Sequence, residues 1–473
     1  AMPALRLPPA GARPIRLHQR VRYGIRWRLL ASPTRPPVTL VLGFATLIVV
    51  GTAALLLPVS ARGDRSDPLT ALFTATSAVC VTGLVVVDTG TYWSPFGQAV
   101  ILLLMELGGL GYVIGVTALS LIWGGRMSLR QRVIVQETGS ALRLGGQGGL
   151  VRRAVLLALA GEAVGALILW ARFAPRYGVV EGLWLAVFHA VAAFANSGFD
   201  LFGDFRSLAD FRTDPVVLLV LAGLTIAGGL SLVVVEELRR TRRWRRLSLD
   251  TKVILIATAV LLLGGTLIIF AAERENPASI AGLSPGWQLL NAFFHSVVAR
   301  TAGFATWDFA QADQRTLFFL LGLMFVGAAP GSMAGGIKVT TAAVIVAAVW
   351  STLRGRPETT LLERRVPARQ VGQALAVAFL ALALIANVAL LISLIEGVRL
   401  RAPFLHLVFE VTSAFGTVGL STGVAPHLSA AGKLLLILTM FVGRLGPVTA
   451  ALTLTARGRE VHYRLPSEPV RIG

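Results

Sequence analysis

Four short segments decide the fold of this chain: Val81-Thr82-Gly83-Leu84, Asn196-Ser197-Gly198-Phe199, Thr301-Ala302-Gly303-Phe304 and Thr417-Val418-Gly419-Leu420. Their glycines, at positions 83, 198, 303 and 419, lie 115, 105 and 116 residues apart. Each of these glycine segments follows a short amphipathic stretch, which itself follows a long apolar run. Self-similarity at a nearly fixed period is typical of one structural unit used repeatedly. The sequence therefore predicts four copies of one unit.

The composition places the chain in a membrane. Hydrophobic residues make up 55% of the sequence and charged residues 14%, and the mean hydropathy is +0.72, all outside the range of ordinary soluble domains. A helix needs about 20 apolar residues to cross a bilayer. We expect spans at residues 37–58, 95–123, 154–171, 215–235, 252–272, 316–350, 371–395 and 432–456.

The net charge of +20 is concentrated in short blocks that adjoin the spans. Of the 44 Lys and Arg residues, 30 lie in segments 1–36, 124–153, 237–252, 352–370 and 456–473. Positive charge on one side of a membrane marks the cytoplasmic side. We therefore expect a multi-pass protein of the plasma (inner) membrane with both termini in the cytoplasm. Anionic lipid head groups, and not nucleic acid, are the expected neighbours of these blocks.

The first unit shows how each copy is built. Residues 68–79 make about three helical turns, too short to span. Residues 80–94 then form a return limb before the span at 95–123. Equivalent half-helices fit residues 181–194, 286–299 and 402–415. Non-helical backbone at membrane depth is tolerated where it is enclosed by protein or lines a wet cavity.

We therefore predict an all-α integral membrane fold of four tandem units, each a span, a re-entrant pore helix and a second span, arranged as a pseudo-tetramer. The expected divisions are a basic N-terminal segment at 1–36, unit 1 at 37–123, unit 2 at 124–235, unit 3 at 236–350, unit 4 at 351–456 and a cytoplasmic tail at 457–473.

The glycine segments predict a cation pore. Glycine reaches backbone conformations that other residues adopt only with strain, and it leaves room for strands to approach closely. Rings of backbone carbonyls can then replace the water shell of a dehydrated cation. The candidate ion-binding residues are Val81, Thr82, Gly83, Asn196, Ser197, Gly198, Thr301, Ala302, Gly303, Thr417, Val418 and Gly419.

Other chemistry-bearing residues favour packing roles. His189, His295 and His406 recur in the half-helices, where hydrogen-bonded packing is the expected role, and no local cluster suits a metal. Cys80 is the only cysteine, and we interpret it as a small buried apolar residue. We find no nucleophile with a base at usable spacing, so the chain is not expected to be an enzyme. No phosphate-binding glycine motif occurs, and no cofactor is expected in this chain.

At the glycine segments the chain resembles the Trk/Ktr/HKT superfamily of cation transporters, over residues 37–456, with the bacterial Ktr-type membrane subunit as the nearest type. The resemblance implies potassium as the transported ion, held at the carbonyls of the glycine segments, with sodium as a candidate activator. Gly83 stands where related plant proteins with sodium preference have serine, which points to potassium. The resemblance also implies a homodimer and a cytoplasmic ring of nucleotide-binding regulatory subunits.

The span at 316–350 is interrupted by ten residues that begin at Gly327 and end at Gly336. Pro330, Gly331 and Gly335 also lie there, and a helix cannot run through them unbroken. A passive kink is one interpretation. The resemblance implies instead a gate loop beneath the pore, with Lys338 directly after it.

Two arginines fall within apolar segments. Arg444 lies in the last span, and the resemblance implies a position in the pore below the glycine segments. Pairing with Glu106 or Glu162 is the alternative, because a charge in an apolar span normally faces protein or water. Arg300 precedes the third glycine segment. We expect it to brace that segment through carbonyl or carboxylate contacts, with Glu410 as a candidate partner.

Three alternatives stay open at this point. A sodium-selective or potassium/sodium-coupled transporter of the same superfamily is the runner-up. A membrane enzyme lacks the paired catalytic groups it needs. A secondary transporter with inverted repeats is disfavoured, because two spans in each unit return the chain to the same side and give the copies one orientation.

Overall fold

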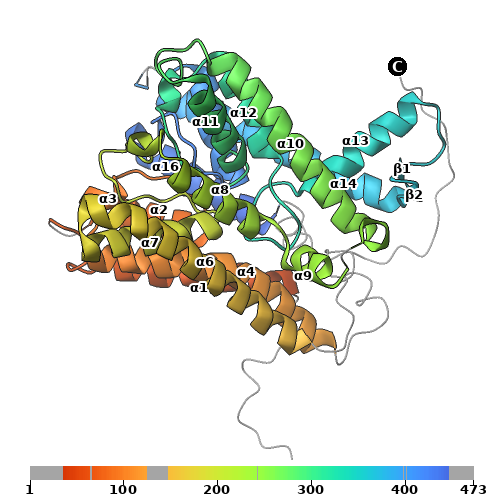
Figure 1. Cartoon of the computed structure of the whole chain (residues 1–473), viewed down its shortest axis with the longest axis horizontal. Coiled ribbons are helices and arrows are strands. Elements are labelled where there is room, and N and C mark those ends of the chain that lie inside the picture. The colour runs from red at the N-terminus through yellow and green to blue at the C-terminus, as the bar shows by residue number, and fades with distance from the viewer. Residues whose placement is uncertain are drawn as a thin grey trace, which may run out of the picture. The chain divides into compact units, whose positions relative to one another are not determined.

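The computed structural model describes residues 36–63, 66–124, 147–241, 243–397, 399–400 and 402–446. The prediction of a helical protein is confirmed, since helices make up most of the described residues (Figure 1). Outside these residues lie the predicted segment 1–36 except its last residue, residues 125–146 of the predicted unit 2, residues 447–456 of the last expected span, and the predicted tail at 457–473.

Four sets of helices follow one another, each with a short helix between two others. The sets are α1 (Pro36–Leu55), α2 (Pro68–Val79) and α4 (Pro95–Gly124); α6 (Gln147–Tyr177), α7 (Val179–Phe194) and α8 (Pro215–Gly229); α10 (Leu249–Glu273), α11 (Pro285–Val298) and α12 (Gln314–Phe325); α14 (Ala368–Glu396), α15 (Phe404–Gly416) and α16 (Ala430–Leu445). The short helices α2, α7, α11 and α15 match the predicted half-helices to within two residues at each end.

Smaller elements connect these sets. They are α3 (Thr89–Tyr92), α9 (Leu232–Arg240), α13 (Val339–Leu353), 3-10 turns at Ala209–Phe211, Trp244–Arg246, Phe309–Gln311 and Ala425–His427, and a hairpin of β1 (Thr360–Leu361) and β2 (Arg364–Arg365). In this antiparallel hairpin Thr360 pairs with Arg365 and Leu361 with Arg364.

The sets pack in a closed cycle. Within each set the short helix contacts the helix before it, through the pairs α1–α2, α6–α7, α10–α11 and α14–α15. Between sets, the last helix of each contacts the short helix of the next, through the pairs α4–α7, α8–α11, α12–α15 and α16–α2. The last of these pairs joins the fourth set to the first, so all four short helices belong to one ring of contacts.

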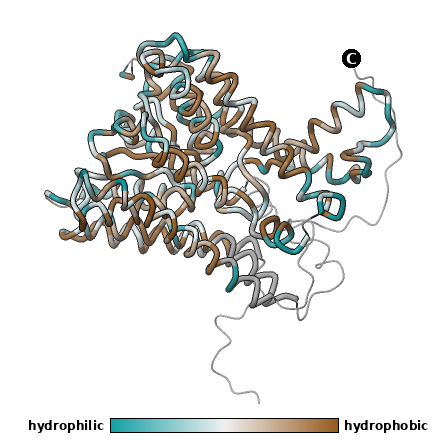
Figure 2. Tube along the Cα trace, viewed as in Figure 1, coloured by the Kyte–Doolittle hydropathy of each residue, from teal (hydrophilic) through white to brown (hydrophobic). Residues whose placement is uncertain are grey.

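Three helices within the described residues are long and apolar enough to cross a membrane: Val155–Tyr177, Leu249–Glu273 and Ala368–Glu396. The helices Pro215–Gly229 and Val233–Arg240, bent by 95°, make a fourth if they are one span. Only 28–33% of the apolar windows of the three long helices is buried inside the protein. The hydrophobic colour along these helices (Figure 2) therefore marks faces suited to lipid.

The expected span at 316–350 is broken at the predicted place. Helix α12 ends at Phe325 and α13 begins at Val339. Val326 and Ile337 pair across the break in a parallel bridge. Gly331 and Gly336 have φ values of 71° and 66°, in the left-handed region that favours glycine. The chain therefore leaves the helix, makes a loop and returns at a similar level.

Candidate functional site

Each short helix ends in a reversal that leads into its glycine segment. The first residues of the four segments, Val81, Asn196, Thr301 and Thr417, all have positive φ, at 56°, 60°, 133° and 50°. The glycines two positions later also have positive φ, at 81° for Gly83, 70° for Gly198, 62° for Gly303 and 93° for Gly419. The left-handed conformation of Val81, Asn196 and Thr417 ends a helix and turns the chain into an extended limb. The reversal thus occurs four times, and the third copy differs at Thr301, whose φ lies outside this left-handed region.

The four glycine segments touch in cyclic order. A methyl group added to Gly83 would overlap the carbonyl oxygen of Ser197, and one on Gly198 would overlap that of Ala302. One on Gly303 would overlap the carbonyl oxygen of Val418, and one on Gly419 that of Thr82. Each of these carbonyls belongs to the residue just before the next glycine. Four main-chain oxygens, on Thr82, Ser197, Ala302 and Val418, therefore lie at equivalent positions around one ring.

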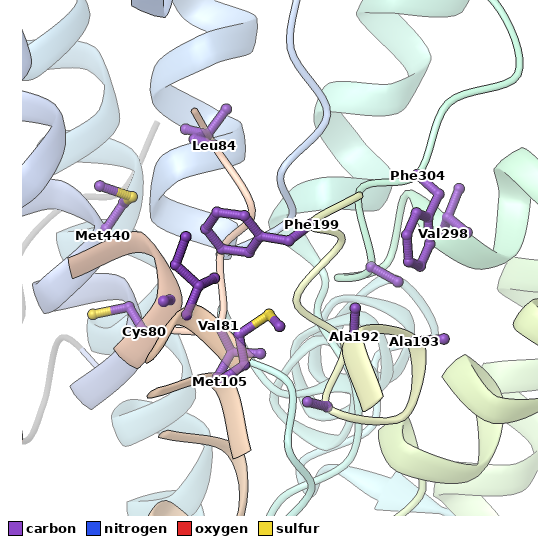
Figure 3. Close-up of a cluster of buried hydrophobic side chains, with 14 of the residues drawn as sticks. Cys80, Val81, Leu84, Met105, Ala192, Ala193, Phe199, Val298, Phe304 and Met440 are labelled. Atoms are coloured by element: carbon purple, nitrogen blue, oxygen red, sulfur yellow. The ribbon is translucent and has the colours of Figure 1, made fainter. Parts of the chain in front are cut away.

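Buried packing holds the first two segments. Cys80 is buried, as predicted, in an apolar cluster with Val81, Met105 and Phe199 (Figure 3). The hydroxyl of Ser197 donates to the Met105 sulfur at 2.7 Å and to the Ala192 carbonyl at 3.2 Å. Helix α4 therefore fixes the second glycine segment directly.

The histidines of the short helices hold the limbs that follow the glycines. His189 bonds to the Leu185 carbonyl at 2.7 Å and accepts from the Leu201 N–H at 3.4 Å. His295 bonds to the Thr306 hydroxyl at 2.9 Å. Both imidazoles are fully buried, so the predicted packing role is confirmed for these two. Among the residues that the structure describes, no group of three His, Cys, Asp or Glu could hold a metal.

Glu410 braces the fourth limb, a role that the sequence did not suggest. Its buried carboxylate accepts from the Ser421 hydroxyl at 2.8 Å and from the N–H groups of Thr422 and Ala425, both at 3.2 Å. Arg300 instead donates to the Gly327 carbonyl at 3.3 Å. We expected Arg300 to brace the third glycine segment, whereas the carbonyl that it contacts belongs to the loop at 327–336.

The loop at 327–336 lies against the fourth glycine segment. A methyl group on Gly335 would overlap the Thr417 hydroxyl, and one on Gly336 would lie 3.4 Å from Gly416 Cα. The loop is also tied to the end of α8, because Ala329 N–H donates to Gly229 O and Met333 N–H to Gly228 O, both at 3.2 Å. The loop thus bridges the second set and the fourth.

Three cationic side chains hold carbonyls of this loop. Besides Arg300, Lys338 donates to the carbonyls of Ala334 at 2.7 Å and Gly335 at 3.5 Å. Arg444 donates to the Met333 carbonyl and, at 2.7 Å, to the Gly108 carbonyl of α4. Arg444 is 3% exposed, so its charge is buried between the loop and a helix of the first set.

Glu106 and Glu162, the acids considered as partners of Arg444, lie on the contacting helices α4 and α6 and interact electrostatically with each other. The sequence could flag each as a charge within an apolar span. It could not show that the two acids meet.

Two further acids lie in the loops after the first two glycine segments. Asp88 accepts from the Phe205 N–H at 2.7 Å, and Asp200 accepts from the Phe202 N–H at 3.3 Å. Burial, reinforced by the nearby Asp88 charge, raises the pKa of Asp200 to about 7.

Comparisons with known proteins agree on one family. Residues 38–459 match TrkH, described as cation transport protein. Ktr system potassium uptake protein B of Bacillus subtilis (strain 168) is 40% identical over 438 residues, which cover 93% of this chain and 97% of that protein. Ktr system potassium uptake protein B of Vibrio alginolyticus is 39% identical over 441 residues, covering 92% and 95%.

Potassium/sodium uptake protein NtpJ of Enterococcus hirae is 35% identical over 444 residues, covering 92% of this chain and 97% of that protein. The crystal structure of the potassium transporter TrkH from Vibrio parahaemolyticus superposes with a TM-score of 0.69 at 19% identity, covering 90% of this chain and 86% of that one. At that identity the likeness supports the fold alone.

Proposed function

Since this chain belongs to the TrkH family of cation transport proteins, we propose that it takes up potassium across the plasma membrane through a pore lined by the four glycine segments. The cyclic contact of Gly83, Gly198, Gly303 and Gly419 with the carbonyls of the neighbouring segments carries this proposal. Membership in a transporter family also sets the chain apart from enzymes.

The proposed filter uses main-chain oxygens as ligands. Carbonyl dipoles replace the water shell of a dehydrated cation without binding it so tightly that it cannot leave. The carbonyls of Thr82, Ser197, Ala302 and Val418 are the proposed common ring, and Val81, Asn196, Thr301 and Thr417 supply the level next to it. The closed cycle of helix contacts supports a pseudo-tetramer of four units, each a span, a re-entrant pore helix and a span, with the divisions given above.

Potassium is the proposed main cargo. Two of the relatives are named for potassium uptake and a third for potassium/sodium uptake. A sodium-selective or coupled transporter is therefore the second candidate, and sodium is the candidate activator. Glycine at position 83, in place of the serine that marks sodium-preferring plant relatives, favours potassium.

The loop at 327–336 is the proposed gate. Gly327, Pro330, Gly331, Gly335 and Gly336 give it a course that no helix can follow. Its contacts with Thr417 and Gly416 support a position next to the pore. Arg300, Lys338 and Arg444 hold its carbonyls, so opening requires these bonds to break or move. A fixed cation at Arg444 also raises the barrier to a passing cation.

The proposed setting is a plasma membrane with both termini in the cytoplasm. The 30 basic residues of the five blocks support this orientation, with anionic lipids as neighbours. A homodimer and a cytoplasmic ring of nucleotide-binding regulatory subunits are the proposed partners. The basic loops supply a surface on which acidic partners can dock.

Purified protein in lipid vesicles tests the function. Isotope uptake is measured for potassium and for sodium, each alone and together, in wild type and Gly83→Ser. We expect potassium uptake in wild type and a shift toward sodium in the variant. Vesicles that pass neither ion overturn the proposal, and vesicles that pass sodium alone favour the second candidate.

A further inference from the structure

Two carboxyl groups lie within the proposed membrane layer. Glu106 is in α4, 11 residues after its start at Pro95, and Glu162 is in α6, 15 residues before its end at Tyr177. At 1.5 Å per residue these separations are about 17 Å and about 22 Å. The hydrocarbon core of a bilayer is about 30 Å thick. If these helix ends lie at one surface, both acids lie inside the hydrocarbon core, about 13 Å and about 8 Å from the opposite surface.

Helices α4 and α6 pack against each other, and the two carboxyl groups interact electrostatically across this contact. Glu162 is 5% exposed. Both oxygens of Glu106 and Oε1 of Glu162 are buried and have no hydrogen-bond partner among the described residues. In the part of the chain that the structure describes, the ion pairs all join other residues.

The surrounding helices bring little charge to the pair. Helices α1, α2 and α8, which contact α4 or α6, contain no ionisable residue. Helix α7 contributes Glu181, exposed in its first turn, and His189, bonded to a carbonyl. The basic residues of α6 lie near its ends, at Arg152, Arg153, Arg172 and Arg176. Arg444 reaches α4 at the Gly108 carbonyl, two residues from Glu106 and about 200° around the helix.

Two ionised carboxylates cannot share such a place at low energy. Their repulsion grows as the dielectric constant falls, and each also loses its hydration. One proton on the pair relieves both effects, because the acid O–H donates to the other carboxylate oxygen. A pair coupled in this way takes up and releases protons as one unit.

The pair adjoins the helix ends that hold the second glycine segment. Met105, next to Glu106, accepts the Ser197 hydroxyl. A methyl group added to Gly109 would lie 3.4 Å from the Ala195 Cβ. Gly161, next to Glu162, packs on the Phe194 ring, 3.1 Å from the place of an added methyl. Separation of α4 from α6 would therefore shift the end of α7 and the segment that follows it.

We propose that Glu106 and Glu162 form a proton-binding site between α4 and α6, and that the bound proton keeps the second glycine segment in its transporting position. The proton stays with the protein and does not travel with the cation. When the last shared proton leaves for bulk water, its O–H bond breaks, the electron pair remains on the carboxylate, and repulsion drives the two helices apart. Cation uptake then falls as the pH rises.

The first test observes the proton itself. Infrared spectra of the protein in lipid films are recorded for wild type, Glu106→Gln, Glu162→Gln, the double variant and the control Glu275→Gln, which alters an exposed acid. We expect a carbonyl-stretching band of a protonated carboxylic acid in wild type at neutral pH that shifts in deuterated water. Asp200, whose pKa is raised to about 7, also contributes to this band, so the pair is read from differences between the variants. The band should keep its full intensity in the control and lose intensity in the double variant.

The second test follows uptake in vesicles at a fixed membrane potential. Between about pH 7 and about pH 9 we expect wild-type and control uptake to fall at least about threefold, and uptake by the double variant to stay constant. A carboxylic-acid band of equal intensity in wild type and the double variant overturns the proposal, as does an alkaline fall in the double variant equal to that of wild type. A band that responds to sodium at constant pH also overturns it, because the site would then bind a metal cation. The infrared result stands even if the vesicles pass no potassium.

Discussion

Alanine at Gly303 is the sharpest test of the proposed ring. The φ value of 62° at this position costs a residue with a side chain about 1–2 kcal/mol. The added methyl would also overlap the carbonyl oxygen of Val418 and come within 2.8 Å of Gly419 Cα. A relaxed carbon–carbon contact is about 3.5 Å or longer. The fourth segment must therefore move by about 0.7 Å or more, and its carbonyl lies on the proposed ion path.

A misplacement of about 1 Å in a preorganised site commonly costs about 100-fold in rate. We expect potassium uptake by Gly303→Ala in vesicles to fall by about that factor. The protein should still fold, because the strain is small compared with the stability of a large domain.

Gly322→Ala is the matched control from the same set of helices. Gly322 lies inside α12, and a methyl group there would meet no heavy atom within 4 Å. Alanine is favoured over glycine in a helix by about 1 kcal/mol, so this variant should transport like wild type. The reasoning is refuted if Gly303→Ala, folded and inserted as well as Gly322→Ala, takes up potassium within about threefold of the control.

Three further predictions concern Arg444, which holds the loop at 327–336, and the two acids Asp200 and Glu410. Arg444→Met removes the charge-assisted hydrogen bond to the Met333 carbonyl, which is worth about 1.5–3 kcal/mol. We expect potassium uptake by this variant to be about tenfold faster or more. Uptake by the control Arg354→Met, at an exposed site, should equal that of wild type. Slower uptake in the first variant would contradict the gate. Asp200 becomes neutral as the pH falls through about 7, so potassium uptake at limiting potassium should decrease in acid. The variant Asp200→Asn should lose this dependence of uptake on pH. If uptake by Asp200→Asn falls in acid as it does in wild type, the role of Asp200 is ruled out. Glu410→Gln replaces one of the two accepting oxygens by an N–H₂ group that cannot accept from the donors there. We expect a lower melting temperature, from about 1–3 kcal/mol lost, and weaker discrimination between potassium and sodium. An unchanged melting temperature would count against this bracing role.

The helix starts and breaks could be predicted because their signals are local. Pro68 follows Asp67, whose carboxylate accepts the Thr70 N–H at 3.0 Å, and α2 has the predicted bounds. The break between Phe325 and Val339 follows from a proline and several glycines within ten residues. Such patterns act within one or two turns of a helix.

The contacts between sets could not be predicted, because they join residues far apart in sequence. Gly419 meets Thr82, which lies 337 positions earlier. We expected Glu410 as a partner of Arg300, but Arg300 donates to the Gly327 carbonyl. We considered Glu106 or Glu162 as a partner of Arg444, but Arg444 donates to the carbonyls of Met333 and Gly108. Apolar helices carry few charges with which to specify their neighbours, so the choice of partner depends on packing.

The contact between α16 and α2 joins the last helix set to the first, and this has a consequence for biosynthesis. A ribosome makes α16, the partner of α2, only after the first three helix sets have been made. The proposed pore needs glycine segments from all four sets. A half-made chain therefore lacks the closed carbonyl ring through which ions would pass, and the order of the chain itself limits leakage during insertion.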